Sequence, residues 1–526
     1  MNKQPIPTVL VSLVVFSFLF GLHFVIVVEA NFLPVLTPQP AYVILSDGSV
    51  DPATAPIQRD GDSYKLTDNI VGYTIAVERD SIVLDGNGYT LQGNGNSTGV
   101  FIKGRNNVTV QNMKISGFTR GIYLFSDVFM EATGNNMLYA NNITNNQWGI
   151  YIQHSTNNVI RNNQLNNTGS IFVTYSPLSD DMPSFINDID TSNTVNGKPI
   201  IYWINQHDKT VPQDAGQVIL VNCTNITVQN LDLTHNSHGV MLIYTNSSTV
   251  TQNSITNNED NGVYVYKSSG NSITENTIED NGDDGVHLWH STDNTVTGNS
   301  LTANNQNGVY LFSSSQNSIN TNDVKLNTQG IYVYSSSMNN NITRNTIIEN
   351  IEDGVTVSWS SKTTISENNI ERNGNGIQID ESSNNIIIGN VVKENIGWGI
   401  QLEDGQKDNI IYHNYFTDNN AEGMQVSIPG LWAPDTWDPG NPNVWDDGEK
   451  GNYWSDYATR YPNATEIGDT GIGDTQFYIN PNNIDRYPIM DPQTIPEFPS
   501  EALVLFTLTI LAVSSVAYRR KMCDKR

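Results

Sequence analysis

The sequence predicts an all-β fold, because one short motif returns about every 23 residues and no helical period lies between its copies. The motif is a glycine followed by an apolar, any and apolar residue. Its copies begin at Gly121, Gly149, Gly239, Gly262, Gly285, Gly308, Gly330, Gly354, Gly376, Gly399 and Gly423. Two further short alternating segments fit inside each period, as in residues 271–281, so each coil holds three strands. The predicted fold is a right-handed parallel β-helix of three-strand coils.

Coils of this kind stack about 4.8 Å apart and bury their inward Val, Ile and Leu side chains in one column. The missing helical period excludes strand–helix–strand units, and propeller blades need roughly 40 residues or more, about twice this period. An asparagine also recurs once per coil, at Asn230, Asn253, Asn276, Asn299, Asn322, Asn345, Asn368, Asn390 and Asn414. Stacked at one turn, these amides are expected to form a structural ladder of hydrogen bonds.

The chain up to residue 428 divides into three predicted parts. Residues 1–30 are typical of a signal peptide, since Lys3 precedes an apolar run from Val9 to Val28 and a small-residue cleavage site at Ala30. An uncleaved membrane anchor is the alternative, because the run is long enough to span a bilayer. Residues 31–75 are a predicted N-terminal cap segment, and the β-helix covers 76–428, with an excursion at 170–217 where the repeat is lost.

The C-terminal part changes composition twice. Residues 429–495 are rich in Trp, Asp and Gly and are predicted to cap the open end of the last coil. In 496–526 an apolar stretch at 502–518 precedes Arg519, Arg520 and Lys521, which indicates a transmembrane helix with a cytoplasmic basic end. We therefore expect an exported protein anchored at the extracellular face of the cell membrane. Cys223 and Cys523 then lie on opposite sides of it, so no internal disulfide forms.

The charge is strongly negative, with 26 Lys and Arg against 54 Asp and Glu and a net charge of -28. Long-range repulsion opposes binding to nucleic acid or to an anionic membrane surface. Cations, neutral glycans and basic proteins are the partners that fit, and solubility in an ion-rich exterior is the alternative reason for the acidity.

Glycosylation acceptors are frequent in this Asn-rich chain, although its composition also produces such triplets by chance. The Asn-X-Ser/Thr triplets begin at Asn96, Asn107, Asn142, Asn166, Asn222, Asn225, Asn246, Asn341 and Asn463.

Aromatic residues gather on the outward side of the glycine-led strands. Strand alternation turns the second and fourth residues after each glycine outward. These positions hold Tyr264, Tyr266, His287, Trp289, Tyr310, Phe312, Tyr332 and Tyr334, with Trp359 one step further along its coil. Rings about 4.8 Å apart form a platform on which sugar rings stack, which predicts a ligand-binding stripe. The alternative is mutual shielding, in which the rings only stabilise the sheet.

Carboxylates border this stripe at Asp260, Asp283, Asp284, Asp353, Asp380, Glu381, Glu403 and Asp404. Acids on adjacent coils suit Ca²⁺ or an acid and base pair for glycoside cleavage, and Asp283, Asp284 and Asp353 are the catalytic candidates. Solvated turn acids are the alternative. For a transition metal the candidates are His235 and His238, with Met241 nearby, against scattered surface histidines.

The coils resemble the right-handed β-helix superfamily of carbohydrate-binding proteins and sugar hydrolases. More specifically they resemble the NosD-like group, named for a periplasmic factor in copper-site maturation of nitrous oxide reductase. The segments that carry this closer resemblance are 196–204, 445–448, 451–457, 471–475 and 485–488, and the resemblance covers about 76–490. The resemblance implies the fold and leaves the activity open, because the residues that match are mostly structural.

Two other resemblances bear on function. Asp283-Asp284-Gly-Val-His287 resembles a polygalacturonase acid pair, but the Gly-His-Gly and Arg-Ile-Lys stretches of that family are missing, as is the Asp-Pro-His-Glu motif of alginate epimerases. The segment 495–500 resembles the Pro-Glu-Phe sorting tails of archaeal surface proteins.

Three hypotheses follow. The first is a surface-anchored protein that binds polysaccharide or glycoprotein glycans without catalysis, as an adhesin or envelope component. The second is a polysaccharide lyase or hydrolase, and the third is a NosD-like copper maturation factor.

Overall fold

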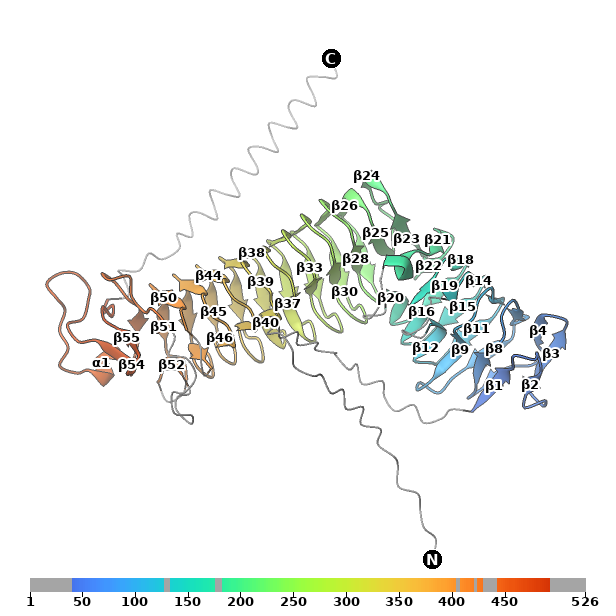
Figure 1. Cartoon of the computed structure of the whole chain (residues 1–526), viewed down its shortest axis with the longest axis horizontal. Coiled ribbons are helices and arrows are strands. Elements are labelled where there is room, and N and C mark those ends of the chain that lie inside the picture. The colour runs from blue at the N-terminus through green and yellow to red at the C-terminus, as the bar shows by residue number, and fades with distance from the viewer. Residues whose placement is uncertain are drawn as a thin grey trace, which may run out of the picture. The chain divides into compact units, whose positions relative to one another are not determined.

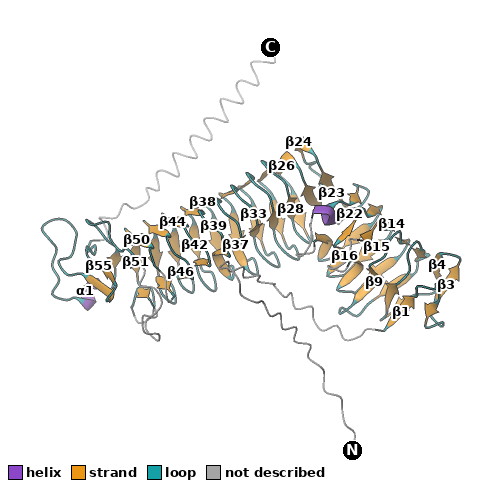
Figure 2. Ribbon diagram, viewed as in Figure 1, coloured by secondary structure: helices purple, strands orange, loops and turns teal. Residues whose placement is uncertain are grey.

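The computed structural model describes residues 40–126, 133–175, 182–403, 407–420, 423–428 and 442–491. Almost all regular structure in this part of the chain is short strand, and most strands pair in parallel with their equivalents one coil before and after (Figures 1 and 2). Val263, Val286 and Val309, for example, lie side by side in three consecutive coils. The prediction of an all-β parallel β-helix is confirmed.

The coils form two consecutive stacks, each with three long sheets, and the first stack has a small fourth sheet. In the first stack, sheet A contains β1 (Ala41–Ile44), β2 (Val50–Asp51), β6 (Thr74–Val77), β9 (Thr98–Lys103), β12 (Arg120–Phe125), β16 (Trp148–Gln153) and β20 (Gly169–Thr174). Sheet B contains β3 (Ile57–Asp60), β4 (Ser63–Leu66), β7 (Val83–Asp85), β10 (Thr109–Gln111), β14 (Met137–Tyr139), β18 (Val159–Arg161) and β21 (Asp188–Ile189). Sheet C contains β5 (Ile70–Val71), β8 (Thr90–Gln92), β11 (Lys114–Ser116), β15 (Asn142–Thr144), β19 (Gln164–Asn166) and β22 (Thr194–Val195), and β13 (Thr133–Gly134) pairs with β17 (Ser155–Thr156) as a small sheet D.

In the second stack, sheet E contains β23 (Lys198–Ile204), β25 (Gln217–Val221), β28 (Val240–Ile243), β31 (Val263–Tyr266), β34 (Val286–Trp289), β37 (Asn307–Phe312), β40 (Gln329–Tyr334), β43 (Val355–Ser358), β46 (Ile377–Asp380), β49 (Ile400–Leu402) and β52 (Val426–Ser427). Sheet F contains β24 (His207–Thr210), β26 (Thr224–Gln229), β29 (Thr249–Thr251), β32 (Ser272–Thr274), β35 (Thr295–Thr297), β38 (Ser318–Asn320), β41 (Asn341–Thr343), β44 (Thr364–Ser366), β47 (Ile386–Ile388) and β50 (Ile410–Tyr412). Sheet G contains β27 (Asp232–Thr234), β30 (Ser254–Thr256), β33 (Thr277–Glu279), β36 (Ser300–Thr302), β39 (Asp323–Lys325), β42 (Thr346–Ile348), β45 (Asn369–Glu371), β48 (Val391–Lys393), β51 (Tyr415–Thr417) and β53 (Tyr453–Trp454).

Two predicted boundaries need correction. β1 already pairs in parallel with β6, so coil pairing begins at Ala41 and not after residue 75. The predicted excursion at 170–217 is the junction of the stacks, where β22 pairs antiparallel with β23 and a 3₁₀ turn at Met182–Phe185 precedes it. A continuous single stack cannot contain that reversal of strand direction, which is why the repeat is lost in this segment.

The glycine of each coil is required by close packing. A Cβ atom on Gly262 would lie 2.5 Å from Cγ2 of Ile278 and 2.7 Å from the carbonyl oxygen of Gly285, closer than real Cβ contacts allow. Gly423, predicted as the last copy of the motif, is different. A Cβ there would face open space, and since Ile400 pairs with Val426, the last coil is longer and places Gln425 beside Gly399.

Buried asparagines link each coil to the next. In the middle of the second stack, Asn299 accepts hydrogen bonds from the backbone N–H of Asn276 (3.0 Å) and from its side chain (2.9 Å). The same ladder runs from Asn253 to Asn414 and ends on Asn452. The prediction of Asn230 as the first member is wrong. The backbone N–H of Leu231 donates to Asn253, and Asn230 is an exposed turn residue with φ 54. A second ladder runs from Asn258 to Asn419.

Tryptophans and a buried carboxylate cover the last coil. Trp454 stacks on Phe416 and on Phe477, at 4.9 Å and 4.5 Å between ring centroids. Its Nε1–H donates to Asp485 at 2.9 Å. Asp485 lies in the hairpin of β54 (Phe477–Asn480) and β55 (Asn483–Asp485). One short helix, α1 (Tyr457–Arg460), lies in the sequence between Trp454 and this hairpin. The apolar end of the core is therefore shielded by large rings.

The two stacks contact each other through the face of sheet A. Ser170 donates to Gln217 at 2.7 Å, and Gln217 donates to the carbonyl of Ile171 at 3.0 Å. Tyr175 stacks on Tyr266 with ring centroids 4.8 Å apart. These contacts place part of the outward face of sheet E inside the protein.

Among the residues that the structure describes, no helix is long and apolar enough to cross a membrane. The predicted signal peptide, residues 429–441 of the predicted cap, the 502–518 segment, the sorting motif and Cys523 lie outside the described residues. Cys223 is buried as a free thiol.

Replacing Asn299 by alanine tests the ladder. The Asn299 side chain makes five hydrogen bonds, and its loss leaves the buried N–H of Asn276 without an acceptor. Since an orphaned buried polar group costs about 1–3 kcal/mol, we expect the free energy of unfolding to fall by about 3 kcal/mol or more. Urea denaturation followed by circular dichroism measures it. Asn305→Ala, at an exposed asparagine of the next turn, is the control, and equal losses in both variants would contradict the ladder's role.

Replacing Glu371 by glutamine tests an ion pair on sheet G. Burial disfavours the charge of Glu371, but the hydrogen bond and charge of Lys393 (2.8 Å) and of Arg372 (3.0 Å) outweigh it and lower the pKa below 4.5. Because a lowered folded-state pKa stabilises the protein above the unfolded value, we expect Glu371→Gln to be about 1 kcal/mol less stable at pH 7. The difference should vanish as the pH falls well below 4.5. Thermal melting from pH 3 to 8 checks this, with Glu279→Gln, in the same column of the sheet, as the control.

Candidate functional site

The outward face of sheet E holds the predicted aromatic stripe, but the structure buries half of it. Tyr264 and Tyr266 are 8% and 1% exposed, and His287 and Tyr310 are also buried. Trp289, Phe312, Tyr332 and Tyr334 are half-buried. Trp359 is 52% exposed but follows β43 in a turn, with φ 50, and so lies off the strand. The prediction of nine water-facing rings is therefore wrong for the first coils.

The first stack is the reason for this burial. Phe185 and Tyr175 contact the Tyr266 ring, and Phe172 contacts His238 at 5.3 Å between centroids. Trp148 donates to Asp260 at 3.2 Å. Burial raises the pKa of Asp260 to about 7, against the opposing effect of that hydrogen bond. Asp260 is thus an interface residue and does not border an open binding surface.

The remaining rings form a short stacked wall on β37 and β40. Tyr310 and Tyr332 lie 5.3 Å apart at an interplanar angle of 22°, and Phe312 and Tyr334 lie 5.7 Å apart. Ring-on-ring packing of this kind stabilises the sheet as well as presenting a surface. Burial, together with the charge of Tyr334, raises the pKa of Tyr332 to about 12, so its hydroxyl stays protonated and can donate a hydrogen bond.

A cavity of about 460 Å³ opens beside this wall, on the next two coils of sheet E. Tyr332 is its aromatic side, and the rest of the lining is polar. The lining residues are Gln329, Tyr332, Glu352, Asp353, Thr356, Ser358, Gly374, Asn375, Gln378 and Asp380. Two of them, Asp353 and Asp380, are among the carboxylates expected from the sequence.

Asp353 is the most buried acid of this pocket. It accepts hydrogen bonds from Asn375 (2.8 Å) and Thr356 (3.1 Å), and it is 7% exposed. Burial raises its pKa despite these bonds. Asp380 accepts a bond from Ser358 at 2.8 Å. A carboxyl group with a raised pKa beside a second acid is suited to donate a proton.

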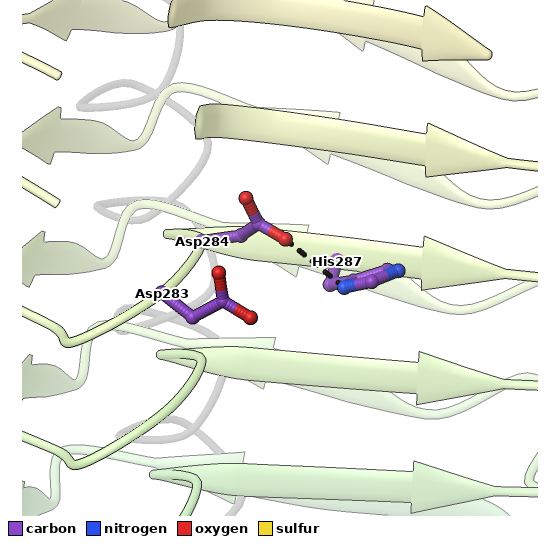
Figure 3. A group of neighbouring side chains, drawn as sticks. All are labelled: Asp283, Asp284 and His287. Carbon is purple, nitrogen blue, oxygen red and sulfur yellow. Dashed lines mark ion pairs between the residues drawn. The ribbon is translucent and has the colours of Figure 1, made fainter. Parts of the chain in front are cut away.

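A second group lies at the start of β34, where Asp283, Asp284 and His287 point toward one another (Figure 3). A ligand atom of each lies within 4.8 Å of the others, and among the described residues this is the one group of three or more His, Cys, Asp or Glu with that property. Nδ1 of His287 lies 3.0 Å from a carboxylate oxygen of Asp284.

The proposed pairing of His235 with His238 is not supported by the structure. His235 is exposed and contacts the hydroxyl of Thr234 at 2.9 Å. His238 is buried under Phe172, and its Nδ1 accepts the backbone N–H of Asn261 at 3.2 Å. Burial, with a smaller contribution from His287, lowers the pKa of His238 to about 3. One ring faces solvent and the other is held neutral inside the stack junction. Met241 is buried as well.

The other predicted site residues are on the surface or partly covered. Glu381 is exposed and Glu403 half-buried, whereas Asp404 lies outside the described residues. Eight of the nine glycosylation acceptors are exposed, and Asn246 is half-buried with its side chain accepting a bond from Ser269. Glycosylation itself stays a prediction.

Sequence reasoning missed the polar half of the pocket, although a signal was present. The residue just before each repeat glycine forms its own column on the edge of sheet E, in which Asn261, Asp284 and Asn307 are bonded in series. In the outward column the residues change from Tyr310 and Tyr332 to Thr356 and Gln378, and the pocket lies at this change.

Two family models match this chain. A family model described as "Right handed beta helix region" matches residues 57–205 and 217–369. A model described as "Periplasmic copper-binding protein (NosD)" matches 302–459. Among curated proteins none matches this chain.

Solved structures with similar coils share little sequence. The periplasmic alginate epimerase AlgG is 14% identical, with 71% of this chain and 80% of that chain covered at a TM-score of 0.34. The A-module of the mannuronan C-5 epimerase AlgE4 from Azotobacter vinelandii is 15% identical, with coverages of 70% and 90% and a TM-score of 0.31. DFA-IIIase from Arthrobacter chlorophenolicus A6 is 10% identical, with coverages of 68% and 89% and a TM-score of 0.35.

The match of the right-handed β-helix model covers more than half of the chain, in two segments separated at the junction between the stacks. The chain therefore belongs to the right-handed β-helix family.

Proposed function

We propose that this protein is an exported β-helix that binds a glycan in the pocket on sheet E between Tyr332 and Asp380. The observation that carries the proposal is the composition of that pocket, in which one aromatic ring stands beside amide, hydroxyl and carboxylate groups in a volume of about 460 Å³. A sugar ring presents an apolar face for stacking and hydroxyl groups for hydrogen bonds. The volume is within the range of ligand sites for small molecules or a few sugar units.

The shape of the surrounding surface favours a polymer over a free sugar. Tyr334 lies on the same strand as Tyr332, and Phe312 continues the apolar wall along the stack direction, one coil further from the pocket. Coils stack about 4.8 Å apart, so a chain lying along this wall meets a ring or polar group at each step. The net charge of -28 favours neutral glycans over acidic ones.

Export is part of the proposal. It rests on the signal-like residues 1–30 and on the match of 302–459 to a family whose name describes a periplasmic protein. Anchoring by 502–518 at the extracellular face of the cell membrane extends it, on the order of apolar and basic residues in that segment.

A second candidate function is cleavage of the bound glycan by Asp353. The specific observation is that Asp353 is buried, has a raised pKa and shares one pocket with Asp380. Glycoside cleavage uses two carboxyl groups, one as the acid and the other as the base or nucleophile.

Fewer observations support the third hypothesis, a role in copper maturation of the NosD kind. Within 302–459 the described histidine is His413, which lies 3.0 Å from Asp447, and copper sites draw on clustered His, Met or Cys.

Replacing Tyr332 by alanine tests glycan binding. We expect about a tenfold or greater loss of affinity, because a stacked ring contributes about 0.5–1.5 kcal/mol beyond the area it buries. The measurement is a screen of neutral and acidic polysaccharides by affinity electrophoresis, followed by titration of the best ligand. Tyr139→Ala, at an exposed tyrosine of the first stack, is the matched control. Failure of the wild type to bind any polysaccharide would contradict the proposal.

Replacing Asp353 by asparagine separates the two candidate functions. Asparagine keeps the shape and an acceptor for Thr356 but loses the acceptor of the Asn375 amide. Binding should therefore change by less than about tenfold, within the range of a single neutral hydrogen bond. If the protein cleaves its ligand, the release of reducing ends is lost in Asp353→Asn. Equal release by the variant and the wild type would rule out Asp353 as the acid.

A further inference from the structure

The group of Asp283, Asp284 and His287 lies on the same face of sheet E as the pocket but has no role in the proposed glycan binding. Its two carboxylates turn toward one imidazole at the start of β34 (Figure 3).

His287 is the second observation that points to a ligand at this group. Its side chain is nine-tenths buried, and neither Nδ1 nor Nε2 makes a hydrogen bond within the described residues. Nδ1 lies 3.0 Å from Asp284, yet the carboxylate oxygen is not in the direction of an N–H bond. Buried polar atoms nearly always have a partner, so two unbonded nitrogens on one ring require an explanation.

The neighbouring residues hold this group in place. Asn307 donates both its backbone N–H (3.0 Å) and its side-chain amide (2.7 Å) to one oxygen of Asp284. The other oxygen of Asp284 is then left facing His287. The His287 ring itself is packed against Tyr310, with ring centroids 4.7 Å apart. Hydrogen bonds that orient a carboxylate in this way are typical of the groups that surround a metal ligand.

We propose that Asp283, Asp284 and His287 bind one divalent cation of the zinc and manganese class. Two carboxylate oxygens and one imidazole nitrogen suit such ions, whereas Ca²⁺ and Mg²⁺ take oxygen ligands and Cu⁺ favours sulfur ligands. Three protein ligands leave at least one coordination position open for water or a bound molecule. The sequence suggested Ca²⁺ for the acids of this stripe. At this site the imidazole favours an ion that accepts a nitrogen ligand.

Metal titration of the full chain tests the site. The protein is stripped with a chelator and titrated with Zn²⁺ and with Mn²⁺ by calorimetry, and Co²⁺ uptake is followed by its visible absorption. We expect one equivalent of metal per chain. Asp283→Asn and His287→Gln should each weaken binding more than about tenfold, since even groups that only orient a ligand change metal affinity by 10–100-fold. His290→Ala is the matched control, an exposed histidine of the same coil whose loss leaves binding unchanged.

Three results would overturn the proposal. The first is no uptake of any of these metals at millimolar concentration. The second is uptake with equal affinity in the wild type, Asp283→Asn and His287→Gln. The third is saturable Ca²⁺ binding that is lost in Asp283→Asn but kept in His287→Gln, which would exclude the imidazole as a ligand. Because Asp283 is only partly buried, its variant keeps the test valid if His287→Gln does not fold. Glycan binding is measured separately in the presence of chelator, so that the metal site and the glycan pocket are tested independently.

Discussion

Hydrogen bonds between buried asparagines of successive coils hold the second stack in register. Each amide oxygen accepts from the backbone and side chain of the coil before it, as Asn299 does from Asn276. This satisfies backbone groups at turns that have no strand partner, and a buried amide without such a partner would be costly. Because every coil then has nearly the same path, outward residues fall into straight columns. Residues of those columns contribute to both the pocket and the group of Asp283, Asp284 and His287.

The junction of the stacks decides which of these columns is available to a ligand. The face of sheet A, with Phe172 and Tyr175, covers the first coils of sheet E and turns Tyr264 and Tyr266 into core residues. Further along, Tyr332, Gln378 and Asp380 occupy the same outward positions, are half-buried and line the pocket. One repeat therefore supplies an internal contact and a candidate binding surface, depending only on distance from the junction.

Much of the fold could be predicted because its physical requirements repeat. The glycine of each coil is fixed by contact with the next coil, and the ladder asparagine by its hydrogen bonds, so both appear at coil spacing. Prediction failed where a coil changes length. Asn230 was predicted at the ladder position that Leu231 occupies, because the coil before Asn253 is one residue shorter. Gly423 was predicted as a motif glycine, but it lies in a coil that is longer than the others.

The sequence by itself determined the parallel coils, the strand order within a coil and which side chains face outward. Those follow from local alternation and from packing between adjacent coils. Only the tertiary structure decided which outward side chains are buried, because that depends on a contact between segments about 90 residues apart, such as Tyr175 and Tyr266. It also placed His287 beside Asp284, which Asn307 holds in position, whereas the sequence had suggested that the acids of this stripe bind Ca²⁺, act as an acid and base pair or are solvated turn residues.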